Sequence, residues 1–236
     1  ITCRDWSSDV CSSDLVPVSF FLVLLIPLAY LFLKESVYSL QTAEAFNVYI
    51  KGLLSFIPVF LLVLLLRGIV PRIHSFPGSF FYFGYRDMLL WVLLSIGMFF
   101  LLKLNRDLYT EERLYFIFLS FFAGVFTPLA ITDLVTYAKN QNSYTLFMLP
   151  LIRLVVFLPL PLLLPKAIAE ARLTKYLYCF LNLLIIPALA LIPAFYYTYH
   201  IVYAVLILAV LLCLAILLFI LNYRDKLTWS FSNKYI

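Results

Sequence analysis

The stretch IVYAVLILAVLLCLAILLFIL, residues 201–221, decides the fold class because it carries no charged side chain over its whole length. About 20 mostly apolar residues are enough for an α-helix to cross the hydrocarbon core of a bilayer. The preceding stretch, 176–197, is also long and apolar, and YYTYH at 196–200 separates the two. A single span cannot be that long, so these residues predict two antiparallel transmembrane helices joined by a tight interfacial turn.

Five more stretches toward the N-terminus qualify as spans by length and composition. They cover residues 16–33, 48–66, 88–102, 114–136 and 145–165. The third is short, and it reaches full length only if Tyr85, Arg86 and Asp87 lie at the interface, where long side chains can extend to water. We therefore expect an all-α, polytopic transmembrane bundle of about seven spans over residues 16–222, with a short cytoplasmic tail at 223–236.

The composition excludes a soluble globular protein. Hydrophobic residues make up 65% of the 236-residue chain and charged residues only 12%, whereas soluble domains are about half apolar and a quarter charged. The Lys and Arg residues lie between the apolar stretches and form no separate basic domain. The lipid bilayer is therefore the expected partner, and nucleic acid is not.

Residues 1–15 differ from the rest of the chain. DWSSDVCSSDL, residues 5–15, resembles the in-frame translation of a common sequencing-library adapter, and residues 1–4 would then be the sample index. We expect this segment to be an adapter-derived artefact at the edge of a metagenomic fragment, with the true N-terminus missing. Without it, 16 basic and 9 acidic residues remain, a net charge of +7, and the cysteines fall from four to Cys179 and Cys213.

The distribution of basic residues predicts an orientation for the seven spans. Eleven Lys and Arg residues lie in the connections and tail on the side of the C-terminus, against four on the opposite side. Loops rich in Lys and Arg face the cytoplasm. The bias therefore predicts the N-terminus outside and the C-terminus inside.

The aromatic run FPGSFFYFGY, residues 76–85, lies in an outer connection in this arrangement. Aromatic rings favour the headgroup level, which indicates a belt-like interfacial segment. A re-entrant hairpin lining a cavity is the alternative, because irregular backbone at depth needs protein or water around it.

Asp133 lies inside the fourth predicted span and Arg153 inside the fifth. Such residues are costly in a membrane and are candidates for function, each with an expected partner. The two spans are antiparallel neighbours, so an Asp133–Arg153 ion pair is geometrically reasonable. The pair could be a structural link between two helices, or it could be a gate or binding element near the outer mouth of a cavity.

Five further residues are candidates for binding or gating. Thr127 and Pro128 precede the acidic residue of the fourth span, where proline kinks the helix and a hydroxyl can satisfy the freed carbonyl. Pro159 and Pro161 lie within one turn and cannot leave a regular helix. Asn182, in the sixth span, is expected to be an interhelical hydrogen-bond partner.

No motif in the sequence indicates catalysis, so an enzyme is not expected. The chain contains neither HExxH nor GxSxG, and its six glycines form no phosphate-binding loop. No His, Cys or carboxylate cluster has metal-ligand spacing, and no cofactor is expected.

The favoured function is a permease-like or transport-associated membrane subunit in a bacterial-type inner membrane, with a separate membrane or ATPase subunit as a potential partner. Proline-broken helices and the intramembrane charges support it. The alternative is a membrane-embedded sensory input module, whose cytoplasmic effector domain is truncated or separate.

Overall fold

The computed structural model describes residues 24–31, 42–71, 75–102, 111–140, 144, 148–160, 163–164 and 174–232. Every regular element in this part of the chain is helical, which confirms the all-α prediction. The suspected adapter segment, 1–15, lies outside the described residues, as do residues 16–23 and 32–33 of the first predicted span and residues 145–147, 161–162 and 165 of the fifth.

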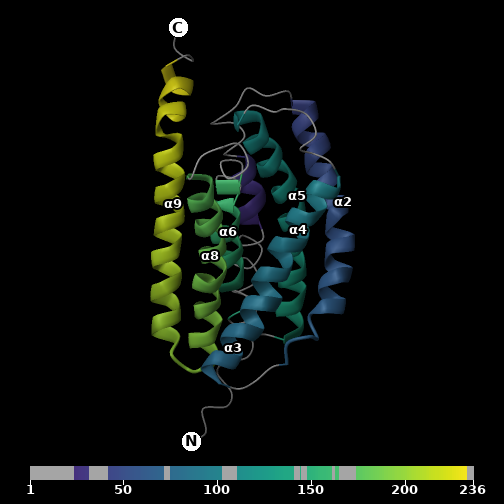
Figure 1. Ribbon diagram of the computed structural model, residues 1–236, viewed down its shortest axis with the longest axis vertical. Helices are drawn as coiled ribbons and strands as arrows, with labels where there is room; N and C mark the ends of the chain where they lie inside the picture. Colours follow the sequence, from purple (N-terminus) through teal and green to yellow (C-terminus); the bar gives the residue numbers. More distant parts are fainter. Residues whose placement is uncertain are drawn as a thin grey trace, which may run out of the picture.

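Eight helical elements are defined in the described residues, besides a helical stretch at 24–31. They are α2 Thr42–Leu66, α3 Phe76–Phe83, the π-helix η1 Gly84–Leu89, α4 Leu90–Leu101, α5 Glu111–Asn140, α6 Leu149–Phe157, α8 Thr174–Tyr197 and α9 Ile201–Ser232. Figure 1 shows α2 and α9 on opposite sides of the bundle, with α5, α6 and α8 between them.

In the described part of the chain, five helices are long and apolar enough to cross a membrane. They run over Glu44–Leu66, Phe76–Leu101, Leu114–Thr136, Tyr176–Tyr197 and Ile201–Ile220. The third, fourth and fifth of these match predicted spans to within one residue, whereas α2 begins six residues before the predicted start. Helix α9 continues to Ser232, so the first part of the predicted tail is helical.

The expected start of the third span at Met88 is wrong, and the aromatic run at 76–85, expected as a separate interfacial segment, is helical and continuous with that span. Residues Phe76–Leu101 form one continuous helical run of 26 residues, made of α3, η1 and α4. The run begins at a defined cap, where the Ser75 hydroxyl accepts a hydrogen bond from the Gly78 amide at 3.1 Å. Pro77 is tolerated because the amides of the first turn have no helical partner.

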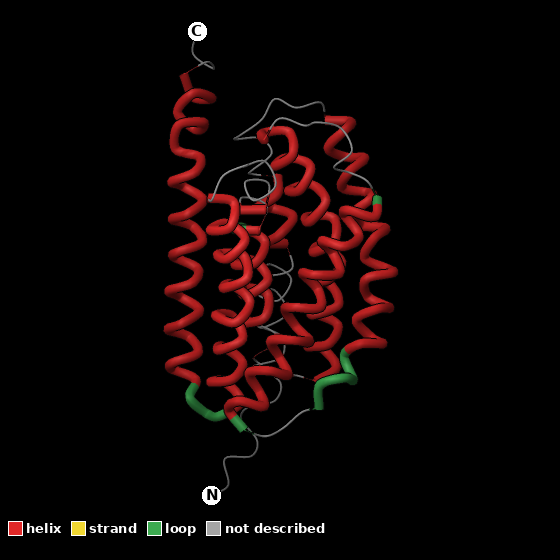
Figure 2. The backbone as a smooth tube through the Cα atoms, in the orientation of Figure 1, coloured by secondary structure: helices red, strands yellow, loops and turns green. Residues whose placement is uncertain are grey.

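The two described connections between adjacent helices lie at the same end of the bundle, as the loops in Figure 2 show. One follows α2, and the other joins α8 to α9. In the second, Tyr199 has a φ of 66° and His200 donates a backbone hydrogen bond to the Phe195 carbonyl. This is the hydrogen-bond pattern of a Schellman cap, and it ends α8 in the tight turn that the sequence predicts.

Helix α5 forms the core of the bundle. Of its most apolar window, 83% of the residues are buried, compared with 17% for α9. Phenylalanines dominate its contacts, and the rings of Phe118 and Phe99 stack with centroids 4.0 Å apart. A helix that is apolar on all sides and buried in this way belongs at the centre of a bundle, whereas α9 presents most of its apolar surface outward.

Helices α2 and α5 approach closely at a pair of glycines. A Cβ atom on Gly52 would overlap the Phe121 carbonyl oxygen, and one on Gly124 would overlap the Tyr49 carbonyl oxygen. Small residues that allow backbones to approach are characteristic of helix contacts in membranes. The contact therefore fixes the spacing of α2 from the central helix.

Replacing either glycine by alanine is expected to separate α2 from α5. The added methyl meets backbone atoms, which cannot rotate away, so Gly52→Ala and Gly124→Ala should each lower the unfolding free energy by about 1–3 kcal/mol. The thermal midpoint of the purified protein in detergent measures the effect.

Gly97→Ala is the matched control, because a Cβ on Gly97 meets nothing within 4 Å. In a helix interior this change is expected to be neutral or to stabilise by up to about 1 kcal/mol. Equal midpoints for all three variants would contradict a glycine-dependent contact.

Candidate functional site

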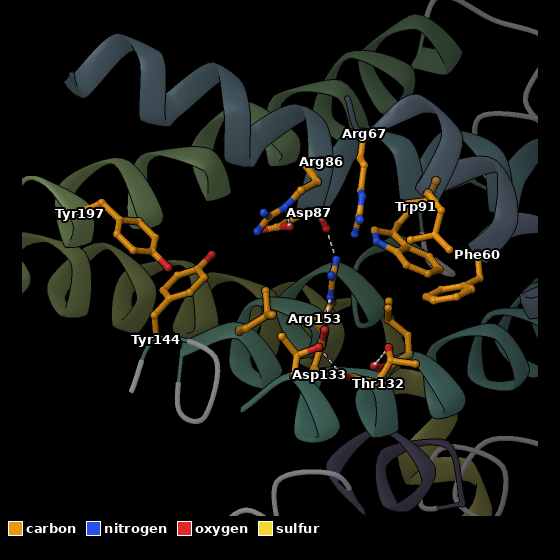
Figure 3. A pocket seen from close by; sticks show the side chains of 15 residues that line it. Phe60, Arg67, Arg86, Asp87, Trp91, Thr132, Asp133, Tyr144, Arg153 and Tyr197 are labelled. Atoms are coloured by element: carbon orange, nitrogen blue, oxygen red, sulfur yellow. Dashed lines mark hydrogen bonds and ion pairs between the residues drawn. The ribbon is translucent and has the colours of Figure 1, made fainter. Parts of the chain in front are cut away.

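A cavity of about 210 Å³ lies between α2, η1, α4, α5 and α6. Its wall includes the end of α2 and the last residue of α8, so it lies near the end of the bundle that carries the α8–α9 turn. The lining residues are Phe60, Val63, Leu64, Arg67, Arg86, Asp87, Trp91, Leu129, Thr132, Asp133, Thr136, Tyr144, Leu149, Arg153 and Tyr197. Figure 3 shows three arginines and two aspartates converging on it.

Arg86 and Asp87 form a two-point ion pair on η1. Arg86 Nε lies 2.6 Å from Asp87 Oδ1, and Nη2 lies 3.1 Å from Oδ2. The remaining terminal nitrogen, Nη1, donates to the Tyr82 hydroxyl at 2.9 Å. Fork-shaped pairs of this kind hold both partners in a fixed orientation. Asp87 is buried, with 6% of its surface exposed.

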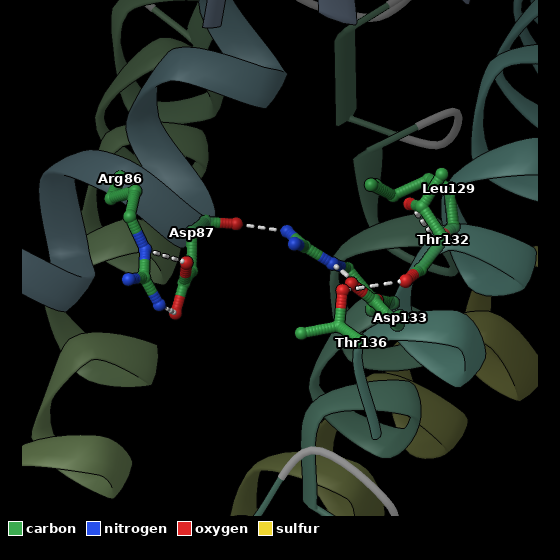
Figure 4. Close-up of polar contacts among 7 residues, drawn as sticks. Arg86, Asp87, Leu129, Thr132, Asp133 and Thr136 are labelled. Atoms are coloured by element: carbon green, nitrogen blue, oxygen red, sulfur yellow. Dashed lines mark hydrogen bonds and ion pairs between the residues drawn. The ribbon is translucent and has the colours of Figure 1, made fainter. Parts of the chain in front are cut away.

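Arg153 joins two helices to α6 through one guanidinium group. Its Nε lies 3.4 Å from Asp133 Oδ2 on α5, and its Nη1 donates to the backbone carbonyl of Asp87 on η1 (Figure 4). Its guanidinium carbon lies 5.8 Å from the centre of the Trp91 ring, which adds a cation–π contact. Only 3% of Arg153 is exposed, so these contacts replace water around the charge.

The π-helical turn places this chemistry in the middle of a long span. The Leu90 amide bonds the Tyr85 carbonyl five residues back, which is the π-helix pattern. Short π-helical segments inside α-helices occur often at functional sites. The Tyr85 hydroxyl also donates to the Leu66 carbonyl at 3.2 Å, which ties η1 to the last residue of α2.

Aromatic rings close the side of the cavity toward the α8–α9 turn. The rings of Phe83 and Tyr197 stack with centroids 4.5 Å apart and an angle of 3° between their planes. Tyr144 lies against both rings, at 6.0 Å and 5.4 Å. The cavity therefore has a charged wall from η1, α5 and α6 and an aromatic wall from Tyr144 and Tyr197, against which Phe83 of α3 packs.

Of the sequence candidates, the structure brings Asp133 and Arg153 together at the cavity, in the ion pair expected from their places in neighbouring spans. Thr127 and Pro128 do not line it. The Thr127 hydroxyl donates to the Ala123 carbonyl at 2.7 Å and accepts from Tyr49 at 3.3 Å, so it faces α2.

The other three candidates lie apart from this site or outside the described part of the chain. Pro159 follows the end of α6, is buried, and its carbonyl accepts from the Leu163 amide at 2.9 Å. The break in the helix expected from the proline pair begins there. Pro161 lies outside the described residues, and so does the side chain of Asn182, although its backbone belongs to α8.

Sequence reasoning did not place Arg86 and Asp87 inside a helix long enough to cross a membrane, because it started their span at Met88. The available signal was the helix start at Ser75 with Pro77 in the first turn, a combination typical of helix N-termini. Starting the span there places both charges near its middle.

Within the described ranges, no three His, Cys, Asp or Glu side chains lie together as a metal site would need. The cavity can instead hold a polar solute through fixed charges and aromatic faces. Over the residues that the structure describes, fold and site define an all-helical protein with five helices suited to cross a membrane and a charged cavity among them. Comparisons with family models, curated proteins and solved structures find no match to this chain.

Removing one partner of the Arg153–Asp133 pair is expected to cost about 3–5 kcal/mol, because the other charge stays buried without its counter-ion. Arg153→Gln should cost more than Asp133→Asn, since it also removes the donor to the Asp87 carbonyl. The double variant should cost less than the sum of the two single changes. Unfolding free energies in mixed micelles measure all three; additive costs would contradict direct coupling.

Proposed function

We propose that this protein is a permease-like or transport-associated subunit of a bacterial-type inner membrane, with seven spans, the N-terminus outside and the C-terminus inside. The cavity lined by Asp87, Asp133 and Arg153 is its solute site. The observation that carries the proposal is the convergence of two Arg–Asp pairs on one cavity inside a bundle of long apolar helices.

Burial of Asp87, Asp133 and Arg153 supports a functional role, because ionisable groups at membrane depth are rare and usually mark substrate or ion pathways. A structural link between α5 and α6 would need only the Asp133–Arg153 pair. The second pair lies on η1, where a π-helical turn interrupts the span beside the same cavity. A linking role does not explain why both pairs line one open space.

The proposed orientation places the cavity near the outer end of the bundle. Arg67 follows the last residue of α2, and Tyr197 ends α8, both at the end predicted to face outside. Arg86 and Lys51 both lie within helices suited to span the membrane, so the basic residues assigned to the outer connections fall from four to three, and those on the other side fall from eleven to ten. The bias that supports this orientation is therefore kept.

Orientation can be tested with two single cysteines in a cysteine-free background. Tyr199 is 92% exposed in the α8–α9 turn, and Tyr176 is 66% exposed near the other end of α8. A membrane-impermeant maleimide should label Tyr199→Cys in intact cells and Tyr176→Cys only after permeabilisation. The reverse pattern would overturn the proposed orientation.

Transport can be tested without knowing the solute. Proteoliposomes loaded with a soluble bacterial extract are expected to release at least one solute faster than protein-free liposomes, as measured by mass spectrometry of the external medium. The matched control is the Asp133→Asn/Arg153→Gln double variant, which removes both charges together and so avoids leaving one of them buried alone. Identical release profiles for the native protein, the double variant and protein-free liposomes would contradict the proposed transport function.

A sensory input module is the second candidate, and helix α9 favours it. This helix continues from Ile201 to Ser232, beyond the span that ends at Ile220, and projects past the other helices in Figure 1. A helix that leaves a bundle without a break can pass a movement to a following domain. An intact gene that continues in frame into a soluble effector domain would favour this candidate, and a stop codon there would count against it.

A further inference from the structure

We infer that the cavity binds a small organic anion, a carboxylate with an aromatic or apolar body, and that Arg67 is the residue that contacts its charge. The inference rests on the proposed function, because it names the class of solute for the same site. It follows from the charge balance of the wall, the position of Arg67, and the composition and size of the cavity.

The charges that line the cavity do not balance. Three arginines face two aspartates, and both aspartates already have an arginine partner. The two-point contact with Arg86 occupies both carboxylate oxygens of Asp87. Among the described residues, the guanidinium of Arg67 has no ion-pair or hydrogen-bond partner. The wall therefore carries one surplus positive charge, which favours an anion and disfavours a cation.

The surplus positive charge is that of Arg67, which lies at the mouth of the cavity. Its amide bonds the Val63 carbonyl at 2.8 Å, so the backbone continues the last turn of α2. The side chain remains exposed, yet Figure 3 shows it pointing into the cavity beside Asp87 and Trp91. A guanidinium so placed can bind a carboxylate through two parallel hydrogen bonds.

The hydroxyls on the α5 side of the cavity are already engaged. Thr132 donates to the Leu129 carbonyl at 2.7 Å, and Thr136 donates to the Thr132 carbonyl at 2.8 Å. These hydroxyl protons are satisfied within α5, so they do not offer the several free donors that a phosphate or sulfate ion would need. One guanidinium suits a single carboxylate better.

The wall beside Arg67 is apolar. The rings of Phe60 and Trp91 lie with centroids 6.3 Å apart, and Val63 and Leu129 also line the cavity. Small-molecule sites typically combine such surfaces with a few polar groups that fix orientation. At about 210 Å³, the cavity is below the roughly 300–1,000 Å³ of typical small-molecule pockets, which indicates a small solute.

Benzoate, benzamide, benzylamine and inorganic phosphate form a probe set that separates charge from shape. Isothermal titration of the full chain in detergent is expected to show millimolar or tighter binding of benzoate only. Arg67→Gln should weaken benzoate binding by about 10- to 100-fold, the effect of losing hydrogen bonds to a charged group. Arg67→Lys, which keeps the charge without the fork, should have an intermediate effect.

Lys51→Gln is the matched control, since it removes the same charge from an exposed residue of α2 that does not line the cavity. Benzoate binding should be unchanged in this variant. Thermal midpoints of both glutamine variants without probe report whether they are folded.

Several outcomes would overturn the inference. If benzylamine or benzamide binds as tightly as benzoate, the site has no preference for anions. If phosphate binds more tightly than benzoate, the solute does not need an aromatic or apolar body. Benzoate binding that Arg67→Gln leaves intact would exclude the assigned residue. If no probe binds while proteoliposomes still show protein-dependent solute release, the anion class fails and the transport proposal stands; if release is also absent, both fail.

Discussion

The guanidinium of Arg153 is the group on which the described arrangement of helices depends. A buried arginine cannot lose its proton, so its charge must be met by protein atoms wherever water is excluded. Here the carboxylate of Asp133, the carbonyl of Asp87 and the ring of Trp91 surround it. These partners come from three different elements, and satisfying one side chain therefore fixes α5, η1 and α4 around α6.

The bond from Arg153 to a backbone carbonyl links the two charged pairs of the cavity. The Asp87 carboxylate is held by Arg86, while the carbonyl of the same residue accepts from Arg153. A change in the geometry of either ion pair would therefore alter the other pair through Asp87, a residue of the π-helical turn. Such a network is costly when only partly satisfied.

The sequence predicted the helical class and the limits of α8 and α9 because uninterrupted apolar stretches and an aromatic turn are local signals. It also placed Asp133 and Arg153 in adjacent spans, from which their pairing could be expected. The long span from Phe76 was missed because Pro77 and the adjacent Arg86–Asp87 pair resemble loop residues when only composition is considered. Arg86 and Asp87 neutralise each other only because their side chains lie in the right geometry, and composition gives no information on that geometry.

The close approach of Gly52 and Gly124, and the contact between Arg153 and a carbonyl 66 residues away in the chain, could not be predicted either. Both depend on which helix faces share an interface. Hydropathy identifies helices but gives little information on how helices that are apolar on all sides rotate about their axes.

The two Arg–Asp pairs have an electrical consequence. Together they carry no net charge, so the transmembrane voltage does almost no work on them if they shift as a unit. A single unpaired charge crossing the full field would contribute about 2.3 kcal/mol per 100 mV. Pairing therefore allows this bundle to keep four ionised side chains among its apolar helices without making their position strongly sensitive to the membrane potential.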